Sequence, residues 1–538
     1  MTDKTTKTKS LESWIWDAAC SIRGAQDAAK FKDYILPLIF VKRLCDVFDD
    51  EIDRIAEKVK TRTKALQLVD RDKTLVRFYL PLRPADVETE PTWNVIRKLS
   101  VKIGEELTNA LRAIAKENKS LDGIINRIDF NATTHGQRDL DEGPLSNLIE
   151  KISQKRLGLK DVEPDIIGRS YEYLIRKFAE GSGQSAGEFY SPAEVGIIMA
   201  KVMQLRPDMY VYDPCCGSSG LLVKCQLVMQ EEMAKKTKGK YVPLKLYGQE
   251  FTPSTWAMSK MNMVIHDMEG VVEIGDTLKS PKFIEGNYQP NTFSLVKDPK
   301  PASSGKLKKF DRVVANPMWN QGRDSLSYIN DDYFINDELE RFPAGSPGGK
   351  IDWGWMQHIY SSLKDGGRAA VVLDTGAASR GSGNAGTNKE KDCRKWFVEQ
   401  DLIEGVIYLP ENLFYNTSAP GIIIFLNKSK QHKNKIYLLH AGKEFQKGDP
   451  KNYITEEGIE KIAAHYNAFT EMEKFSRMVS KDEVVKNDYN ISPSRYIQIT
   501  EAETYRPLAE LVEELQTLEE EAKGYDKELR GIFKKLGV

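Results

Sequence analysis

The chain has few cysteines, no long apolar run and no regular spacing of histidines. Its six cysteines are scattered without a CxxC pair, which argues against a disulfide framework or a zinc site and favours a reducing cytoplasm. No apolar run approaches the ~18 residues that cross a bilayer, and residues 1–10 lack the apolar core of a secretory signal. We therefore expect a cytoplasmic protein with no membrane contact and no metal site.

An excess of basic charge is also missing. Lysine and arginine total 78 against 79 aspartates and glutamates, which leaves a net charge of −1. A protein that grips duplex DNA by itself usually carries a strong basic excess. Tight binding of duplex DNA by this chain alone is therefore not expected.

The 538 residues exceed what one hydrophobic core usually organises, so two or three domains are expected. Apolar residues recur at helical spacing through the first part of the chain. Farther on, short β-rich runs alternate with helical segments, which predicts a largely parallel α/β sheet. The last two runs, 406–409 and 422–426, are joined by a short loop and should pair antiparallel. The predicted domains are 1–165, helical; 166–475, α/β; and 476–538, a C-terminal segment.

The C-terminal segment carries an apolar seam of the coiled-coil type. Its members follow one another in alternating steps of three and four residues: Leu508, Leu511, Leu515, Leu518, Ala522, Tyr525, Leu529, Ile532 and Leu536. Such a 3.5-residue period favours a helix that meets a partner chain, although a helix packed on its own chain carries the same pattern.

Acidic residues follow three successive predicted strands. Asp213 opens the stretch DPCCGSSG, where glycines let the backbone turn tightly and approach a ligand. Two serines follow Gly217, so the lysine of a phosphate-binding P-loop is missing. Glu250 ends the next run and is placed to hold ribose hydroxyls; Asp276 ends the third and is placed to accept from an exocyclic amine. One such acid is commonly only a solvated strand end, but three in register predict a nucleoside site.

The stretch GEFYSPAE, residues 187–194, lies just upstream. Ser191 and Glu194 have the spacing of a capping box, with Pro192 at the first helical position. Phe189 and Tyr190 stand ahead of this cap, where they could form a wall for an adenine ring.

A short apolar run ends abruptly in NPMW, residues 316–319. Asn316 offers an amide oxygen, and Pro317 offers a carbonyl without an N–H of its own. Two fixed acceptors at one strand end suit an amino group that must become nucleophilic, and Trp319 offers a flat face on which a base can stack. A plain strand exit with Trp319 in the core fits the tetrapeptide about as well, because short motifs give false positives.

Together these blocks resemble the modification (methyltransferase) subunits of type I restriction-modification systems. Four blocks carry the likeness in the family's order: GEFYSP, DPCCGSSG, GDTL at 275–278 and NPMW. WIWDAACSIRG near the start and LPENLFYNTSAPGIIIFLNK at 409–428 are similar as well. The resemblance implies a seven-stranded, mostly parallel Rossmann-like methyltransferase sheet. An all-helical N-terminal domain should precede this sheet, and a C-terminal helical tail should follow it.

The implied activity is S-adenosylmethionine-dependent methylation of adenine N6 in duplex DNA, with the target base flipped out of the helix. By the resemblance, Asn316 and the Pro317 carbonyl hold N6, and Trp319 stacks on the base. The implied cofactor-binding residues are Glu188, Phe189, Tyr190, Ser191, Asp213, Cys215, Gly217, Ser218, Ser219, Gly220, Glu250, Asp276 and Asn316.

The chain departs from the family pattern in three places. Met318 stands where proline is usual, Trp319 where phenylalanine or tyrosine is usual, and Ser219 where many relatives have glycine. None of these changes removes a group that the chemistry needs.

The resemblance also implies a multisubunit complex. A specificity subunit would read the DNA, which agrees with the near-neutral charge, and a restriction subunit would cut unmethylated DNA. Two copies of this chain are expected in each complex, and the seam at 508–536 is the predicted docking surface.

Two other functions fit parts of the pattern. The Asn-Pro-x-aromatic block also serves enzymes that methylate a glutamine amide in protein, because an amide nitrogen poses the same chemical problem. A non-catalytic scaffold is the other alternative, and only Met318 and Trp319 support it.

Overall fold

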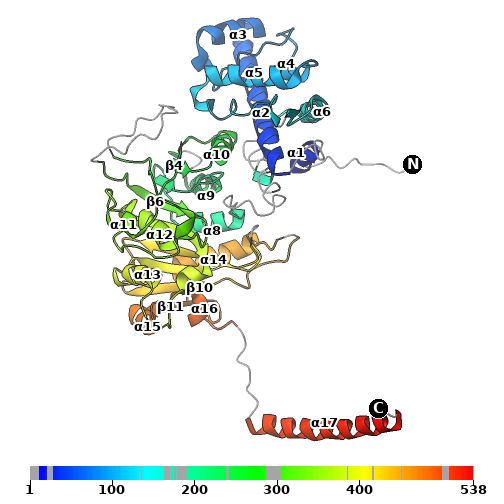
Figure 1. Ribbon diagram of the computed structural model, residues 1–538. Coiled ribbons are helices and arrows are strands. Elements are labelled where there is room, and N and C mark those ends of the chain that lie inside the picture. Colours follow the sequence, from blue (N-terminus) through cyan, green and yellow to red (C-terminus); the bar gives the residue numbers. More distant parts are fainter. Residues whose placement is uncertain are drawn as a thin grey trace.

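A computed structural model describes most of the chain and divides it into a helical domain, an α/β body and a long C-terminal helix (Figure 1). The described residues are 11–20, 28–134, 136–162, 170, 172–174, 177, 191–237, 241–285, 305–384, 386–414, 417–449, 451–499 and 508–536.

The N-terminal domain is built around the long helix α2, Ala28–Val59. The other helices of this domain are α1 Leu11–Cys20, α3 Arg62–Arg71, η1 Lys73–Leu75, α4 Asn94–Arg97, α5 Ile103–Glu117, η2 Lys119–Leu121 and α6 Glu142–Ser153. A small antiparallel hairpin follows η2 and precedes α6 in the chain; its strands are β1, Thr133–Thr134, and β2, Gln137–Arg138. The expectation of an all-helical domain is wrong in this detail. Strands of two residues are too short to leave an alternating pattern in the sequence.

The α/β body contains one nine-stranded sheet in the order β11-β10-β8-β9-β7-β6-β3-β4-β5. Its strands are β3 Tyr210–Asp213, β4 Lys245–Glu250, β5 Gly270–Ile274, β6 Phe310–Ala315, β7 Leu363–Asp374, β8 Ile403–Tyr408, β9 Gly421–Asn427, β10 Lys435–His440 and β11 Ser476–Ser480. Strands β3 to β7 pair in parallel. Strand β9 runs antiparallel between β7 and β8, so the predicted antiparallel pair is confirmed.

The expected count of seven strands is therefore wrong by two. Strand β10 adds to β8 in parallel, and β11 adds to β10 antiparallel, which widens the sheet at one edge. The apolar run of β10 is too short for its period to distinguish strand from helix, and β11 holds only two apolar residues, Met478 and Val479.

Helices cover both faces of this sheet (Figure 1). The helices described in the α/β body are α8 Ala193–Val202, α9 Gly220–Thr237, α10 Pro253–Ile265, η3 Arg323–Ser325, α11 Asp331–Ile335, α12 Asp352–Ser361, η4 Thr375–Ala378, α13 Lys389–Glu399, α14 Glu456–Ala468, α15 Lys481–Lys486 and α16 Pro493–Tyr496. Side chains of β6 alternate between two buried clusters: Val314 belongs to the one that includes residues of α8, α9 and α14, whereas Val313 and Ala315 belong to the one that includes residues of α12 and α13. This alternation follows from the two-residue period of a strand.

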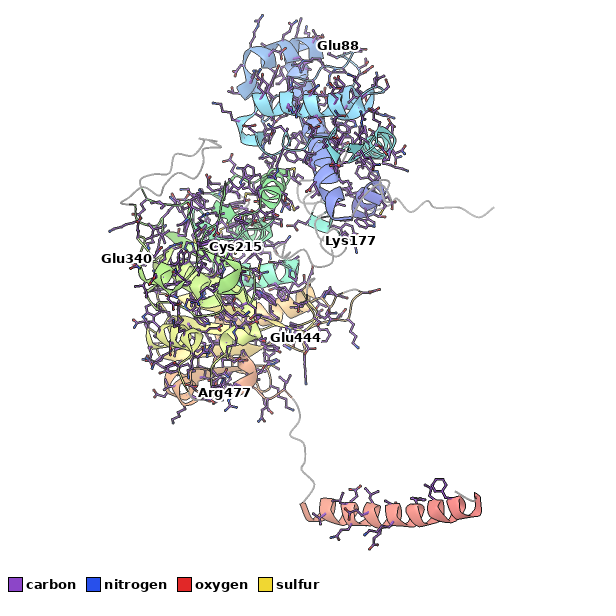
Figure 2. All side chains as sticks on the ribbon, in the orientation of Figure 1. Glu88, Lys177, Cys215, Glu340, Glu444 and Arg477 are labelled. Carbon is purple, nitrogen blue, oxygen red and sulfur yellow. The ribbon has the colours of Figure 1, made fainter. Side chains whose placement is uncertain are left out.

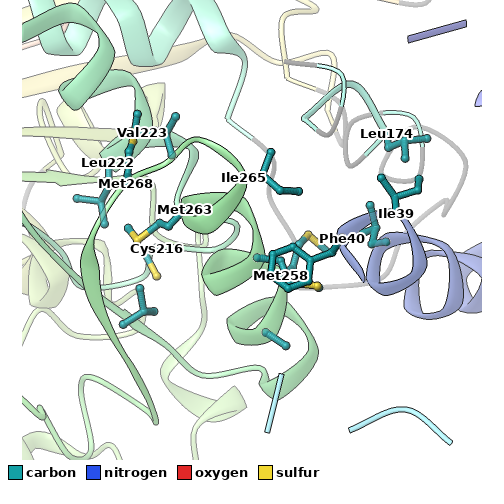
Figure 3. Packing of buried hydrophobic residues seen from close by; sticks show 14 of the residues in the cluster. Ile39, Phe40, Leu174, Cys216, Leu222, Val223, Met258, Met263, Ile265 and Met268 are labelled. Atoms are coloured by element: carbon teal, nitrogen blue, oxygen red, sulfur yellow. The ribbon is translucent and has the colours of Figure 1, made fainter. Parts of the chain in front are cut away.

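The N-terminal domain and the α/β body share one hydrophobic core. Helix α2 packs against α10, and buried residues of both belong to a single continuous cluster. Figure 3 shows Phe40 of α2 lying against Met258 of α10.

The C-terminal helix α17, Leu508–Leu536, lies apart from the sheet (Figure 1). Four members of its apolar seam, Leu515, Leu518, Tyr525 and Leu529, are between 51% and 69% exposed. Among the described residues, no helix is long and apolar enough to cross a membrane.

Candidate methyltransferase site

The candidate site lies where the parallel strands β3, β4 and β6 end. Because these carboxyl ends meet at one edge of the sheet, Asp213, Glu250 and Asn316 come together there. One pocket at this edge is lined by Ser191, Asp213, Cys215, Cys216, Gly217, Ser218, Gly220, Leu221 and Asn316. Cys215, labelled in Figure 2, marks its place in the α/β body.

The glycine turn is held against β4 by close backbone packing. The Cys216 N–H donates to the Gln249 carbonyl at 3.0 Å. A Cβ atom on Gly248 would lie 2.8 Å from Cys216 Sγ, so glycine is required for this approach. Gly217 has a positive φ of 52°, as expected of a turn that needs glycine.

Ser219 does not face the pocket, although it was predicted to bind the cofactor. Its side chain is fully buried, and its hydroxyl contacts that of Ser259 in α10. Its φ of 62° lies in the left-handed region, which explains why glycine would also suit this position.

Glu250 is fixed beside the turn by two backbone amides. Its Oε2 accepts from the Gly217 N–H at 3.0 Å, and its Oε1 accepts from the Thr252 N–H at 2.8 Å. These two bonds fix the carboxylate at the edge of the glycine turn.

Asp276 follows the end of β5 by two residues and is also held in place. Its Oδ1 accepts from the N–H groups of Leu278 and Lys279, and the Tyr328 hydroxyl donates to its Oδ2. Burial and this bond raise the pKa of Tyr328, which keeps its hydroxyl protonated. No motif marks Tyr328 in the sequence, and only folding of the loop after NPMW brings it to Asp276.

The amide of Asn316 has a defined orientation. Its Nδ2 donates to Ser191 Oγ at 2.9 Å, and its Oδ1 accepts from Trp319 Nε1 at 2.9 Å. The predicted capping role of Ser191 is therefore wrong. Helix α8 begins one residue later than predicted, with Pro192 as its N-cap, and the Ser191 hydroxyl serves Asn316 instead.

Asn320 directly follows the NPMW block, and a group of charged residues holds it in place. The Asn320 N–H donates to Asp352 Oδ1 at 3.1 Å, and its side chain donates to Asp374. Arg380 donates to Asn320 Oδ1 at 2.7 Å and pairs with Asp352, Asp374 and Glu390. These contacts fix the exit of the block to β7, α12 and α13, and the sequence alone did not identify them.

Burial controls the titration of the pocket. It raises the pKa of Asp213 to about 7, and the nearby negative charge of Glu250 adds to this effect. Burial also raises the pKa of the Cys215 and Cys216 thiols, which keeps both neutral.

The structure brings seven of the fifteen predicted site residues into one pocket, whose lining does not include Pro317, Trp319, Glu250 or Asp276. Ser191, Asp213, Cys215, Gly217, Ser218, Gly220 and Asn316 line one pocket, which Cys216 and Leu221 complete. Glu188, Phe189 and Tyr190 lie outside the described residues. In the part of the chain that the structure describes, no three His, Cys, Asp or Glu side chains form a group that could hold a metal.

The fold and this edge of the sheet define an α/β methyltransferase. The sequence profile of the N-6 DNA Methylase family matches residues 162–504, and that of the HsdM N-terminal domain matches residues 11–152. The chain therefore belongs to the N-6 DNA methylase family, as a methyltransferase subunit of the type I restriction-modification kind. Its activity is adenine-specific DNA methylation.

Relatives and solved structures agree with this family. The type I restriction enzyme MjaVIII methylase subunit of Methanocaldococcus jannaschii is 34% identical over 453 residues, which cover 80% of this chain and 71% of that protein. The HindI methylase subunit of Haemophilus influenzae is 27% identical, over 80% of this chain and 91% of that protein. The crystal structure of a type I methyltransferase subunit from Streptococcus thermophilus has a TM-score of 0.71 at 26% identity, covering 91% of this chain and 99% of that one. These matches do not favour the protein-methylating or scaffold alternatives.

Proposed function

We propose that the pocket at the ends of β3 and β6 binds S-adenosylmethionine and receives an adenine flipped out of duplex DNA. The observation that carries this proposal is that Asp213 and Asn316 line the same pocket. A cofactor held at Asp213 would thus lie beside the amide that holds the base. Extruding the base costs a few kcal/mol, which contacts in the site must offset.

The residues present suit the cofactor. When bound, S-adenosylmethionine supplies an electrophilic methyl group. The Asp213 carboxylate suits a cationic amine, the Glu250 carboxylate suits two ribose hydroxyls, and Asp276 suits the amine of adenine. Gly217 and Gly220 line the pocket, where the lack of a side chain lets the backbone approach a ligand closely.

Catalysis in this proposal depends on position and hydrogen bonding. The Asn316 amide oxygen and the Pro317 carbonyl accept from the two hydrogens of adenine N6, which turns the nitrogen lone pair toward the methyl donor. Trp319 offers its face to the base. Arg380 and Asn320 act indirectly, because they hold the loop that carries these groups.

Cofactor binding should depend on pH through Asp213. The protonated carboxyl cannot pair with a cationic amine, and its pKa of about 7 leaves it mostly protonated at pH 6. We expect the Kd for S-adenosylmethionine to fall by roughly tenfold between pH 6 and pH 8. Isothermal titration calorimetry at a series of pH values measures this directly.

The unliganded protein should show the opposite trend in stability. A carboxyl whose folded pKa exceeds its ordinary value of 3.8 binds more protons in the folded state. Its contribution to the free energy of unfolding therefore falls as pH rises from about 4 to 7. The control is Asp213→Asn, which should bind the cofactor weakly at every pH. Affinity of the unaltered protein that stays constant from pH 6 to pH 8 would contradict this role of Asp213.

We further propose that α17 docks on a specificity subunit and that this partner provides most of the DNA-binding affinity of the complex. The exposed seam of α17 supports the first part, and the net charge of −1 supports the second. A restriction subunit and a second copy of this chain complete the proposed assembly.

Methyl transfer tests the proposal as a whole. Labelled S-adenosylmethionine and duplex DNA are incubated with the chain alone and with the specificity subunit. N6-methyladenine that forms only with the partner is the expected result. Transfer by the chain alone would contradict the division of labour, and no transfer despite bound cofactor would contradict the proposed site.

A further inference from the structure

The amide of Asn316 already makes one hydrogen bond within the chain through each of its two polar atoms. Its oxygen accepts from Trp319 Nε1, its nitrogen donates to Ser191 Oγ, and the residue is only 8% exposed. The oxygen that must accept from adenine N6 in the proposed function is thus bonded by the indole of Trp319.

The ring of Trp319 is held in this position from its other side. It packs edge-on against Phe414, with ring centroids 4.7 Å apart and planes at 69°. It also lies over Gly421, the first residue of β9, where a Cβ atom would come within 2.9 Å of Trp319 Cη2. The ring is therefore fitted between the Asn316 amide and the start of β9.

This arrangement conflicts with stacking of a base on the same ring. The indole N–H points along the plane of its ring, so Asn316 Oδ1 lies near that plane. A base stacked on the ring lies about 3.5 Å above the plane, and its own amine also donates roughly along its ring plane. One oxygen cannot lie in both planes, so the indole and the base amine compete for it.

We propose that Trp319 occupies the place of the adenine amine in the resting enzyme and must leave Asn316 when the base enters. This inference rests on the proposed function, because it assumes that adenine N6 binds Asn316. Only a base with a correctly placed amine restores the hydrogen bond that is lost. Trp319 is thereby a specificity-determining residue as well as a stacking surface.

An isosteric replacement separates the N–H from the ring. We would place 3-benzothienylalanine, which has sulfur where the indole has N–H, at position 319 of the chain in its complex with the specificity subunit. With S-adenosylhomocysteine bound, the Kd for duplex DNA containing the target adenine should fall about fivefold. One net hydrogen bond no longer has to be broken, and such a bond corresponds to a roughly two- to tenfold change in an equilibrium. Fluorescence anisotropy of labelled duplex gives the Kd.

Two controls make the result specific to base entry. A duplex with an abasic target has no base to seat, so its Kd should not change, and the same replacement at Trp396, on α13, should leave both Kd values unchanged. Unchanged affinity for the target adenine, or equal tightening for the abasic duplex, would overturn the inference. Failure of the unaltered complex to methylate adenine would instead overturn the proposed function.

Discussion

Asn316→Ala is expected to lower the rate of adenine methylation by about a hundred- to a thousandfold. The substitution removes one of two fixed acceptors for N6, and the loss of one such preorganised group typically costs a factor of this size. Cofactor affinity should change little, because Asp213 and Glu250 are the proposed charged contacts for the cofactor. Methyl transfer by the complete complex measures the rate, and calorimetry measures the affinity.

Asn467→Ala is the matched control. Asn467 is exposed on α14, and its side chain donates to the Lys201 carbonyl, far along the chain from the NPMW block. This variant should methylate at the normal rate. The catalytic role of Asn316 is wrong if Asn316→Ala keeps more than about a tenth of the activity while binding the cofactor normally.

Removal of α17, leaving residues 1–507, should abolish assembly with the specificity subunit. The helix presents Leu515, Leu518, Tyr525 and Leu529 to solvent, and burying a leucine side chain stabilises an interface by about 1.5–3 kcal/mol. The double variant Leu515→Asp and Leu518→Asp should therefore weaken association by at least about a hundredfold. Analytical ultracentrifugation of the mixed subunits measures the loss.

Charged positions on the same helix provide the control. Glu520→Ala and Glu521→Ala change exposed residues outside the seam and should leave assembly intact. The shortened chain and the Leu515→Asp, Leu518→Asp double variant should still bind S-adenosylmethionine, because the pocket lies in the α/β body. Normal assembly of the shortened chain would show that the partner docks elsewhere.

The sequence predicted the strand ends on which the site depends. Asp213 and Glu250 end short β-rich runs and Asn316 follows one, and the alternation of such runs with helical segments predicted parallel strands. Parallel pairing then brings their carboxyl ends together, whatever the details of the loops. The resemblance of the four sequence blocks to those of a methyltransferase family then indicated which reaction these residues serve.

Contacts between distant loops could not be predicted in this way. Tyr328 reaches Asp276, and Arg380 reaches Asn320, only because irregular segments fold back onto the edge of the sheet. Such contacts have no period and no motif. The hydrogen bond between Trp319 and Asn316 shows the same limit between near neighbours. The NPMW block predicted that both residues belong to the site, but not that one would bind the other.

The core that α2 and α10 share also bears on how such proteins can diversify. The two matched family regions, 11–152 and 162–504, contribute buried residues to one cluster, with Phe40 against Met258. Interiors are packed tightly enough that a mismatch of one methylene group is felt. Recombination between relatives at the junction of these regions would pair surfaces that had not been selected together. The two regions are therefore expected to be inherited as one unit, whereas α17, whose described side chains lie outside this core, would be free to change with its proposed partner.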